Sequence, residues 1–412
     1  MSEEPSLLRS IDATENRSVP RRWRIAPLGQ VCRLVNGDAY KDSDWSSEGV
    51  PIVRIQNLND HSKPFNYWAG RLDDRVLVNT GDVLLAWSGT PGTSFGAHLW
   101  RRGKGALNQH IFRVDIDTEV LLPQWAVWAI NQQLIAMIGS AHGGVGLRHV
   151  KKALVEALPM VLPPLAEQRR IVAIVASQLA IVERAQVSAQ AQVEAAAALP
   201  AAYLRTAFNS REAYQWPRKP LGEIAELLPS KSISTSGDCE VRTITTACLS
   251  ESGFLPRGIK SARMRSADAA KSMVSAGEIL VARSNTPELV GRAALFLGEA
   301  PGVVASDLTI RIRMAEGFSP AFVAAYLSFL YLSGYWKERA GGASGSMKKI
   351  TRTQIQAEPV PVPSPDIQFR IAIGIVRNME GIAALASSLN SRLGAIGALP
   401  ATLLRRAFNG EV

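Results

Sequence analysis

Polar side chains suited to hydrogen-bonding nucleic acid stand in several short segments of this 412-residue chain. Arg, Lys, Asn and Gln match the edges of nucleobases, whereas cations, small hydroxyls and backbone amides match phosphates. Arg54-Ile55-Gln56-Asn57 follows an expected strand, and strand alternation would place Arg54 and Gln56 on one face. Ser88-Gly89-Thr90-Pro91 and Ser284-Asn285-Thr286-Pro287 would offer hydroxyls on tight turns. A solvated edge strand and purely structural turns are the alternative interpretations.

Two glycine-rich basic loops are the strongest candidates for phosphate contact. They span residues 143–149 and 341–349 and end in Arg148-His149 and Lys348-Lys349. A flexible backbone can follow a duplex, and cations on it release counterions; ordinary solubilising charge is the alternative. The residues predicted to contact DNA are Lys41, Arg54, Gln56, Asn57, Ser88, Thr90, Asn108, Gln109, Arg148, His149, Lys151, Lys152, Arg242, Arg283, Ser284, Asn285, Thr286, Lys348, Lys349 and Arg352.

The overall charge agrees with an anionic partner. A net charge of +10 favours nucleic acid first and a membrane surface second, although the basic residues are scattered along the chain. The N-terminal segment is acidic and lacks the apolar core of a signal peptide, and no run approaches 18 uninterrupted apolar residues. We therefore expect a cytoplasmic protein that does not span a membrane.

Sequence motifs of familiar catalysts are absent. The chain has no GxxxxGK[ST] phosphate-binding loop, no HExxH, and no His, Cys or Asp cluster with metal-ligand spacing. Cys32, Cys239 and Cys248 form no CxxC pair, so neither a zinc site nor a disulfide framework is indicated. We predict no catalytic residue, no metal and no cofactor in this chain, although missing motifs do not by themselves exclude an enzyme.

A repeat with a period of 200 residues organises the chain. Without any gap, the two copies share the pairs Pro159/Pro359, Pro163/Pro363, Gln168/Gln368, Arg170/Arg370, Ile171/Ile371, Leu199/Leu399, Pro200/Pro400, Leu204/Leu404, Arg205/Arg405 and Phe208/Phe408. Such a period indicates two copies of one structural plan. We divide the chain into an N-terminal tail (1–20), a first domain (21–150), a central helical region (151–210), a second domain (211–350) and a C-terminal helical region (351–412).

Each domain is expected to be largely β and rich in loops. Short apolar runs such as residues 51–55 and 82–87 are separated by Gly, Pro, Asn and Asp, which is typical of strands. Residues 81–91 correspond to 277–287, and helical stretches follow at 123–138 and 320–336. Both domains begin with Trp-x4-Leu-Gly, at Trp23 and Trp216. The predicted class is α+β, with two pseudo-symmetric mixed domains.

Heptads predict a coiled coil that joins the two domains. Apolar residues recur at a and d positions over four heptads in each copy, in helices of roughly 30 to 35 residues, or about 50 Å. The short connection at 210–215 favours antiparallel over parallel helices, and Gln186 at an a position could fix their register. The predicted core residues are Val172, Val175, Leu179, Val182, Val193, Ile375, Met379, Ile382, Leu389, Leu393 and Ile396.

These features resemble the specificity subunits of type I restriction-modification enzymes. The resemblance rests on the helix entry Leu162-Pro163-Pro164-Leu165-Ala166-Glu167-Gln168, the Leu-x-x-Ala-Phe-Asn exits and the Trp-x4-Leu-Gly starts, and it covers nearly the whole chain. The second copy departs from the pattern at Asp366-Ile367-Gln368, which weakens an essential docking role for the acid.

The resemblance implies a non-catalytic reader of double-stranded DNA. Each target recognition domain would read half of a bipartite asymmetric site, while the helices would set the spacer and dock two methyltransferase (modification) subunits, which restriction/translocase subunits join. S-adenosylmethionine, ATP and Mg²⁺ would belong to those partners, and the chain accordingly lacks the Asn/Asp-Pro-Pro-aromatic motif of adenine methyltransferases. A stand-alone enzyme with a duplicated domain and a coiled-coil scaffold are the alternatives.

Overall fold

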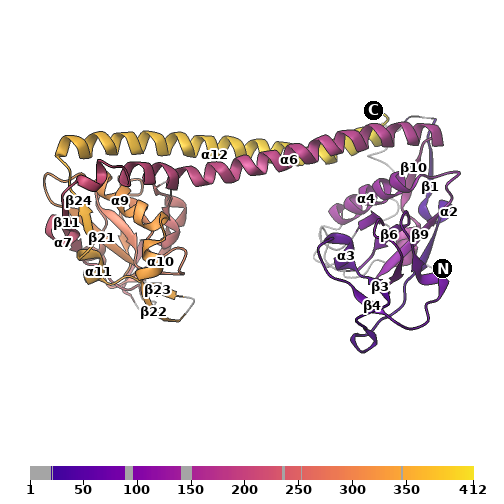
Figure 1. Cartoon of the computed structure of the whole chain (residues 1–412), viewed down its shortest axis with the longest axis horizontal. Coiled ribbons are helices and arrows are strands. Elements are labelled where there is room, and N and C mark those ends of the chain that lie inside the picture. The colour runs from indigo at the N-terminus through magenta and orange to yellow at the C-terminus, as the bar shows by residue number, and fades with distance from the viewer. Residues whose placement is uncertain are drawn as a thin grey trace. The chain divides into compact units, whose positions relative to one another are not determined.

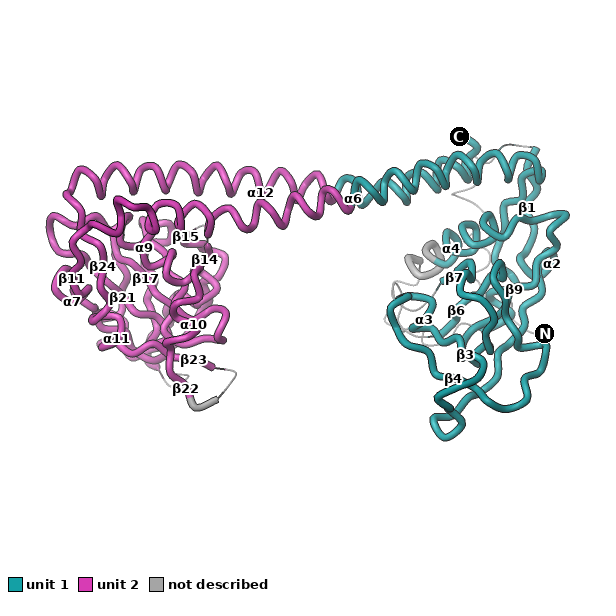
Figure 2. Tube along the Cα trace, viewed as in Figure 1, with its two compact units in different colours: residues 1–186, 395–412 teal, residues 187–394 magenta. Residues whose placement is uncertain are grey.

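The chain folds into two compact units, shown in different colours in Figure 2. The computed structural model describes residues 20, 22–88, 96–140, 151–233, 237–251, 253–344 and 347–412. Unit 1 comprises Met1–Gln186 with Ala395–Val412, and unit 2 comprises Val187–Gly394. The helical regions, which we predicted as segments of their own, are therefore each divided between the two units.

Unit 1 contains two four-stranded sheets. The first is antiparallel, in the order β2-β9-β6-β7, and α4 packs against β7. The second has the order β4-β3-β8-β5, in which β3 and β8 are parallel. Their bounds are β2 Cys32–Asn36, β3 Val50–Val53, β4 Asn66–Trp68, β5 Leu77–Val78, β6 Val83–Ala86, β7 Gly96–Leu99, β8 Gly105–Leu107, β9 Ile111–Ile116 and α4 Pro123–Ser140.

Unit 2 repeats this plan. The sheet β12-β21-β17-β19 matches the first sheet of unit 1, and β16-β13-β20 again contains a parallel pair, β13 with β20. The repeat that the sequence predicted is thus confirmed in strand order and direction. Bounds are β12 Ala225–Leu228, β13 Cys239–Ile244, β14 Leu249–Ser250, β15 Gly253–Phe254, β16 Lys260–Met264, β17 Ile279–Ala282, β19 Ala293–Leu295, β20 Val303–Ala305, β21 Thr309–Met314 and α9 Pro320–Leu332.

Short helices connect the strands. Their bounds are α2 Leu28–Val31, α3 Ile55–Asn59, α5 Lys152–Glu156, α7 Leu221–Ile224, α8 Ser266–Ser272, α10 Tyr335–Arg339 and α11 Arg352–Gln356, with 3-10 turns η2 Asp42–Asp44, η3 Asp74–Val76, η4 Ala213–Gln215, η5 Thr246–Cys248 and η6 Pro256–Gly258.

The repeated Leu-Gly start of each domain allows close packing of two short helices. An ideal Cβ at Gly29 would lie 3.0 Å from Cβ of Glu156 on α5, and one at Gly222 would lie 3.3 Å from Cβ of Gln356 on α11. Leu28 beside the first glycine is fully buried. A small antiparallel sheet flanks each contact, formed by β1 (Arg24–Pro27) with β10 (Pro159–Leu162) and by β11 (Arg218–Pro220) with β24 (Pro359–Pro361).

The long helices α6 (Leu165–Phe208) and α12 (Pro365–Phe408) have 44 residues each, more than the 30 to 35 expected. Their heptad seams are as predicted: every residue of the predicted core is buried or half-buried, while most positions between them are exposed. Within each unit the start of one helix lies beside the end of the other, as in Figure 1. In unit 1 Arg170 donates to the carbonyl oxygen of Val412, and in unit 2 Asn378 donates to the Tyr203 hydroxyl. The antiparallel arrangement is confirmed in both units.

The repeated Gln of each helix entry is a buried clamp. The side-chain oxygen of Gln168 accepts from the Leu122 N–H at 2.9 Å, and its NH2 group donates to the carbonyls of Val120 and Pro163. Gln368 likewise accepts from the Ser319 N–H at 3.0 Å and donates to a carbonyl at the helix entry. The clamps therefore tie α6 and α12 to the loops that precede α4 and α9.

The repeated Phe of each helix exit fills a domain core. Phe408 is 3% exposed in unit 1 and its ring centroid lies 4.6 Å from that of Trp125. Phe208 is 2% exposed in unit 2 and lies 5.5 Å from Phe322. The last turn of each helix thus belongs to the core of the domain that the other copy of the sequence builds.

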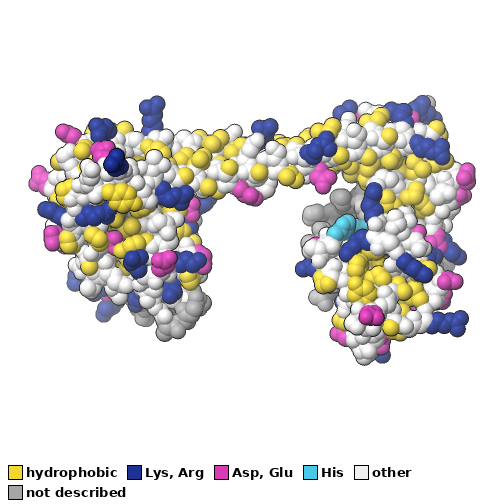
Figure 3. Space-filling view, viewed as in Figure 1, with side chains coloured by type: hydrophobic (Ala, Val, Ile, Leu, Met, Phe, Trp, Pro, Cys, Tyr) yellow, Lys and Arg dark blue, Asp and Glu magenta, His cyan; other side chains and the backbone are white. Residues whose placement is uncertain are grey.

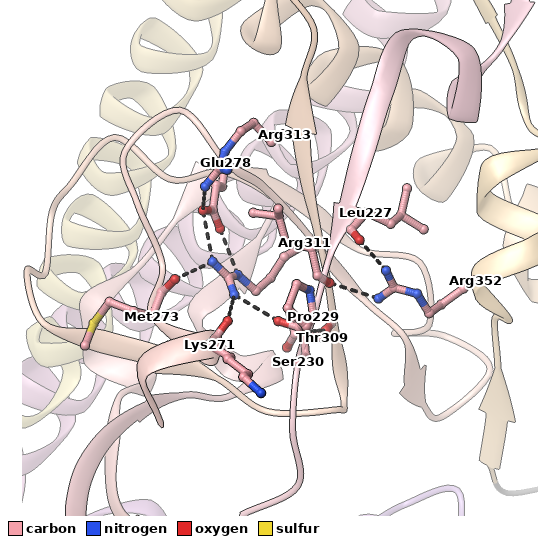
Figure 4. Close-up of polar contacts among 11 residues, drawn as sticks. Leu227, Pro229, Ser230, Lys271, Met273, Glu278, Thr309, Arg311, Arg313 and Arg352 are labelled. Atoms are coloured by element: carbon pink, nitrogen blue, oxygen red, sulfur yellow. Dashed lines mark hydrogen bonds and ion pairs between the residues drawn. The ribbon is translucent and has the colours of Figure 1, made fainter. Parts of the chain in front are cut away.

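A buried arginine fastens the central sheet of unit 2 (Figure 4). Arg311 on β21 is paired with Glu278 at 2.8 Å, and the two side chains are 3% and 1% exposed. Its guanidinium also donates to the carbonyls of Pro229, Lys271 and Met273. Nε and both Nη atoms of Arg311 therefore donate to acceptors, as a buried cation requires.

By length and composition alone, α6 and α12 are apolar enough to cross a membrane, and 17% and 0% of their most apolar windows are buried. Their heptad stripes pack on each other within each unit, which accounts for part of this apolar content. Large hydrophobic side chains remain exposed on the outer faces, at Ile181, Val187, Leu199, Phe369, Ile373, Val376, Leu385 and Leu399.

Candidate nucleic-acid interface

A hollow of 290 Å³ in unit 1 brings together two of the predicted polar segments. Residues on either side of β3 and the turn after β8 face each other across it, although they are about fifty positions apart in the sequence. The lining residues are Tyr40, Asp42, Trp45, Arg54, Ile55, Gln56, Asn108, Gln109 and His110.

Arg54 and Gln56 do not lie on a strand, so our alternation argument is wrong. The strand β3 ends at Val53, Arg54 is the N-cap of α3, and Gln56 lies in that helix. The two side chains nevertheless line the same hollow. The guanidinium of Arg54 lies over the ring of Trp45, 5.0 Å from its centroid, which is a cation–π geometry.

Two predicted contact residues serve the fold instead. Asn57 is fully buried; its side-chain oxygen accepts from the Arg54 N–H at 3.2 Å and its NH2 group donates to the carbonyls of Lys63 and Pro64. Lys152 donates to the carbonyl of Leu34 at 2.8 Å. The buried Asn57 side chain is thus committed to the fold, whereas the Lys152 side chain is 47% exposed and also pairs with Glu156 at 3.7 Å.

The turn Asn108-Gln109-His110 forms one wall of the hollow. Asn108 is 8% exposed and its side-chain oxygen accepts from the His110 N–H at 3.3 Å. Gln109 is exposed, with Nε2 3.3 Å from Nε2 of His110. Nδ1 of His110 and Nε1 of Trp45 are buried and have no hydrogen-bond partner within the described residues.

The remaining candidates of unit 1 are dispersed. Lys41 is exposed at the N-cap of η2, next to the hollow-lining Asp42, and Lys151 is exposed at the N-cap of α5. Ser88 is buried, 8% exposed. Thr90 and the loop end Arg148-His149 lie outside the described residues.

In unit 2 the second glycine-rich segment is a hairpin and not a loop. β22 (Gly341–Ser344) pairs with β23 (Met347–Lys349), and β23 also pairs with β18 (Ser284–Asn285). Ser284 lies opposite Lys349 and Asn285 opposite Lys348. Four predicted contact residues from two distant segments therefore share one small sheet.

Arginines adjoin this sheet. Arg283 donates to the carbonyl of Asp307 at 3.4 Å, and Thr286 donates its backbone N–H to the Asn285 side chain. Arg352 donates to the carbonyls of Leu227 and Leu228, and its pKa is lowered by burial and by the neighbouring charge of Arg283. Arg352 therefore acts chiefly as a structural tether. Arg242 is exposed on β13, in a different sheet.

Trp45 is the site residue that sequence reasoning missed. A single Trp within the polar stretch 41–49 is a usable signal, because a large aromatic in a loop needs a packing or binding reason. The distribution of charge does not locate a site. Figure 3 shows Lys and Arg side chains spread over both units and interspersed with Asp and Glu.

Comparison with known proteins agrees with this architecture. Residues 20–189 match the family model described as the type I restriction modification DNA specificity domain. The type I restriction enzyme EcoKI specificity subunit of Escherichia coli is 21% identical over 96% of this chain and 90% of its own length. The chain is therefore similar to type I specificity subunits over nearly its whole length.

Other specificity subunits share only part of this chain. The EcoBI subunit of E. coli is 24% identical and the MjaVIII subunit of Methanocaldococcus jannaschii 23% identical, each over 37% of this chain. The matched segments span only 32% and 35% of those two subunits, about one third of their length.

Two solved structures have the same fold as this chain. A chain from a structure of the type I R-M system aligns with TM-score 0.76 at 19% identity, over 96% of this chain and 99% of its own. The HsdS subunit from Thermoanaerobacter tengcongensis aligns with TM-score 0.58 at 19% identity, over 96% and 98%.

Proposed function

We propose that this chain is the DNA-reading, non-catalytic subunit of a type I restriction-modification complex, with each domain reading one half of a bipartite asymmetric site. The duplicated domain plan carries the proposal: the sheet β2-β9-β6-β7 of unit 1 recurs as β12-β21-β17-β19 in unit 2, and each unit has a second sheet with one parallel pair. The hollow beside Trp45 is the contact of the first domain, and the sheet β18-β23-β22 is that of the second.

The paired helices set the distance between the half-sites and dock two methyltransferase subunits. The exposed apolar side chains on the outer faces of α6 and α12 support docking, because such faces mark protein interfaces. Both readers must meet one side of the duplex, so we expect half-site centres about one turn apart, roughly 34–36 Å.

The chemistry is assigned to the partners. S-adenosylmethionine, ATP and Mg²⁺ would bind the modification and restriction/translocase subunits, which would supply adenine methylation and ATP-dependent cleavage. We place the complex in the cytoplasm, where its DNA is found.

Selection of bound duplexes from a random pool tests the proposal. The full chain, assembled with its modification subunit, should enrich two short motifs separated by a spacer of fixed length. Binding without sequence preference would overturn it. Activity of the isolated chain on DNA or on a small molecule would favour the duplicated-enzyme alternative.

A further inference from the structure

A buried carboxylate in unit 2 stands where unit 1 has a leucine. Glu358, just before β24, is 4% exposed, and Leu158, its equivalent in the 200-residue repeat, is 6% exposed. Their backbone carbonyls accept the N–H groups of Leu221 and Leu28, each at 2.8 Å, so both residues take the same place in the fold. An apolar side chain is therefore sufficient there, and a carboxylate that is costly to remove from water needs another reason.

The Glu358 side chain joins β24 to α10. Tyr335, the first residue of α10, donates its hydroxyl to Oε2 of Glu358 at 2.7 Å. The Arg339 guanidinium lies over the Tyr335 ring, 3.9 Å from its centroid. The charge of Arg218 on β11 and the phenol of Tyr326 on α9 also interact with this carboxylate. The donor that contacts the carboxylate is thus a neutral hydroxyl.

The hairpin β22–β23 emerges from the core beside this contact. It leaves the core of unit 2 after Ala340 and returns to it at Ile350, which are 3% and 0% exposed. The helix α10 directly precedes the hairpin and α11 follows it. Any bond between the segments on either side therefore restrains the position of the hairpin.

Two side-chain bonds join these flanking segments, and together we call them the brace. One is the Tyr335–Glu358 bond. In the other, Nε2 of Gln354 on α11 donates to the carbonyl oxygen of Arg339 at 3.1 Å. The Gln354 bond does not involve an ionisable side chain, so the charge of Glu358 is the variable element of the brace.

The ionisation of Glu358 changes the strength of the brace. Burial raises the pKa of this carboxyl above its ordinary 4.5, although the Tyr335 hydroxyl and the charges of Arg339 and Arg218 oppose the rise. Burial also raises the pKa of Tyr335, to about 12, and that of Tyr326, so both phenols stay neutral. A closed brace therefore binds a proton more readily than an open one, in which water solvates the carboxylate. By linkage, closure is weakest above the raised pKa and strengthens as the pH falls through it.

We propose that Glu358 is a positioning residue that holds the hairpin β22–β23 in place for the second half-site, and holds it more firmly when its buried carboxyl is protonated. The proposal rests on the function proposed above, in which the sheet β18-β23-β22 is the contact of the second domain. Discrimination between second half-sites should therefore weaken as the pH rises.

Hydrogen–deuterium exchange of the full chain without DNA tests the brace. After correction for the intrinsic effect of pH, protection of β22 and β23 should fall about tenfold from about pH 5 to about pH 8, the factor expected for a pKa difference of about one unit. Glu358→Gln should retain protection at both pH values, because the neutral amide still accepts from Tyr335. Tyr335→Phe should lower protection, most at about pH 8. Glu338→Gln, which alters an exposed carboxyl on α10, is the matched control and should preserve the wild-type profile.

Titration of duplexes that differ only in the second half-site tests the positioning role. The preference of the wild-type chain for its own second half-site should follow the protection profile, and Glu358→Gln should keep this preference at both pH values. Thermal melts of each variant establish that it folds. Glu358→Leu, which places the residue of unit 1 in unit 2, removes the same ionisation and keeps the test valid if Glu358→Gln does not fold.

Equal hairpin protection at both pH values in the wild type, or a pH dependence that survives Glu358→Gln, would overturn the brace. Protection that responds to pH while the second half-site preference does not would overturn the positioning role and leave the proposed function standing. Binding without any sequence preference would reject the proposed function and the positioning role with it, whatever the exchange profile.

Discussion

At the scale of the residue, the polar side chains that line the hollow should determine which bases the first domain accepts. We expect Arg54→Ala and Gln109→Ala each to weaken binding to the first half-site by about 1–3 kcal/mol, because each removes a side chain suited to a base contact. Titrating labelled duplexes that vary one half-site at a time measures this. Arg71→Ala, which alters an exposed arginine outside the hollow, should change the affinity by less than about 0.5 kcal/mol, and equal losses for all three variants would contradict a site-specific role.

His98 on β7 makes the stability of unit 1 depend on pH. Burial, together with the charge of His61, holds the pKa of His98 below its usual 6.5. The unfolded chain therefore binds the proton more readily than the folded chain, and stability must fall as the pH drops below about 6.5 towards the lower folded value. We expect His98→Gln to flatten this part of the profile in urea unfolding between pH 7.5 and 5.5; parallel profiles would contradict it.

Sequence reasoning found the polar side chains of the hollow, but it did not distinguish those that line the hollow from those that hold the fold together. Arg54, Gln56, Asn108 and Gln109 were predicted from residue type, and the structure brings them together. Asn57 has the same chemistry, yet its NH2 group donates to the carbonyls of a loop several residues away. Such commitment depends on tertiary contacts, which residue type does not encode.

At the scale of the element, the buried Gln clamps fix where each long helix starts. We expect Gln168→Leu to lower the free energy of unfolding by about 1–3 kcal/mol, because it leaves the Leu122 N–H and the Val120 carbonyl without a partner. Gln178→Leu is the matched control, since the side-chain oxygen of Gln178 has no partner within the described residues. Chemical denaturation compares them, and equal effects would argue against the clamp.

The Arg311–Glu278 pair should be costly to break. We expect Arg311→Met to destabilise unit 2 by about 3–5 kcal/mol, because Glu278 would remain buried without its main partner. Adding Glu278→Leu should recover part of the loss, since it removes the unpaired charge. A double variant no more stable than Arg311→Met would show that the loop carbonyls bound by Arg311 matter more than the charge.

The heptads made the long helices predictable, whereas their ends were not. Apolar spacing gave the seam correctly, but the expected 30 to 35 residues fell short of the 44 observed in each helix. Both helices continue to Phe208 and Phe408 because these rings are buried in domain cores. The same limit explains the hairpin β22–β23: Gly-rich sequence suggested a loop, and its pairing with β18 is a long-range contact.

At the scale of the whole molecule, the helix pair should act as a ruler. Inserting one heptad into each helix, after Gln186 and before Ala395, adds about 10.5 Å at 1.5 Å per residue. We expect the recognised spacer to grow by about three base pairs at about 3.4 Å each, with both half-sites unchanged. Sequencing of bound duplexes measures the spacer, and insertion into one helix alone is the control because it misaligns the seam. An unchanged spacer would reject the ruler.

The return of the C-terminal segment to unit 1 sets the order in which the chain is finished during synthesis. Unit 2 is one continuous stretch that ends at Gly394, whereas unit 1 also needs Ala395–Val412. A ribosome therefore completes the second domain while Trp125 of the first still lacks the ring of Phe408. The domain that is translated first is therefore the last to complete its core. A premature stop after residue 394 would leave unit 2 with all of its residues but would remove the C-terminal segment from unit 1.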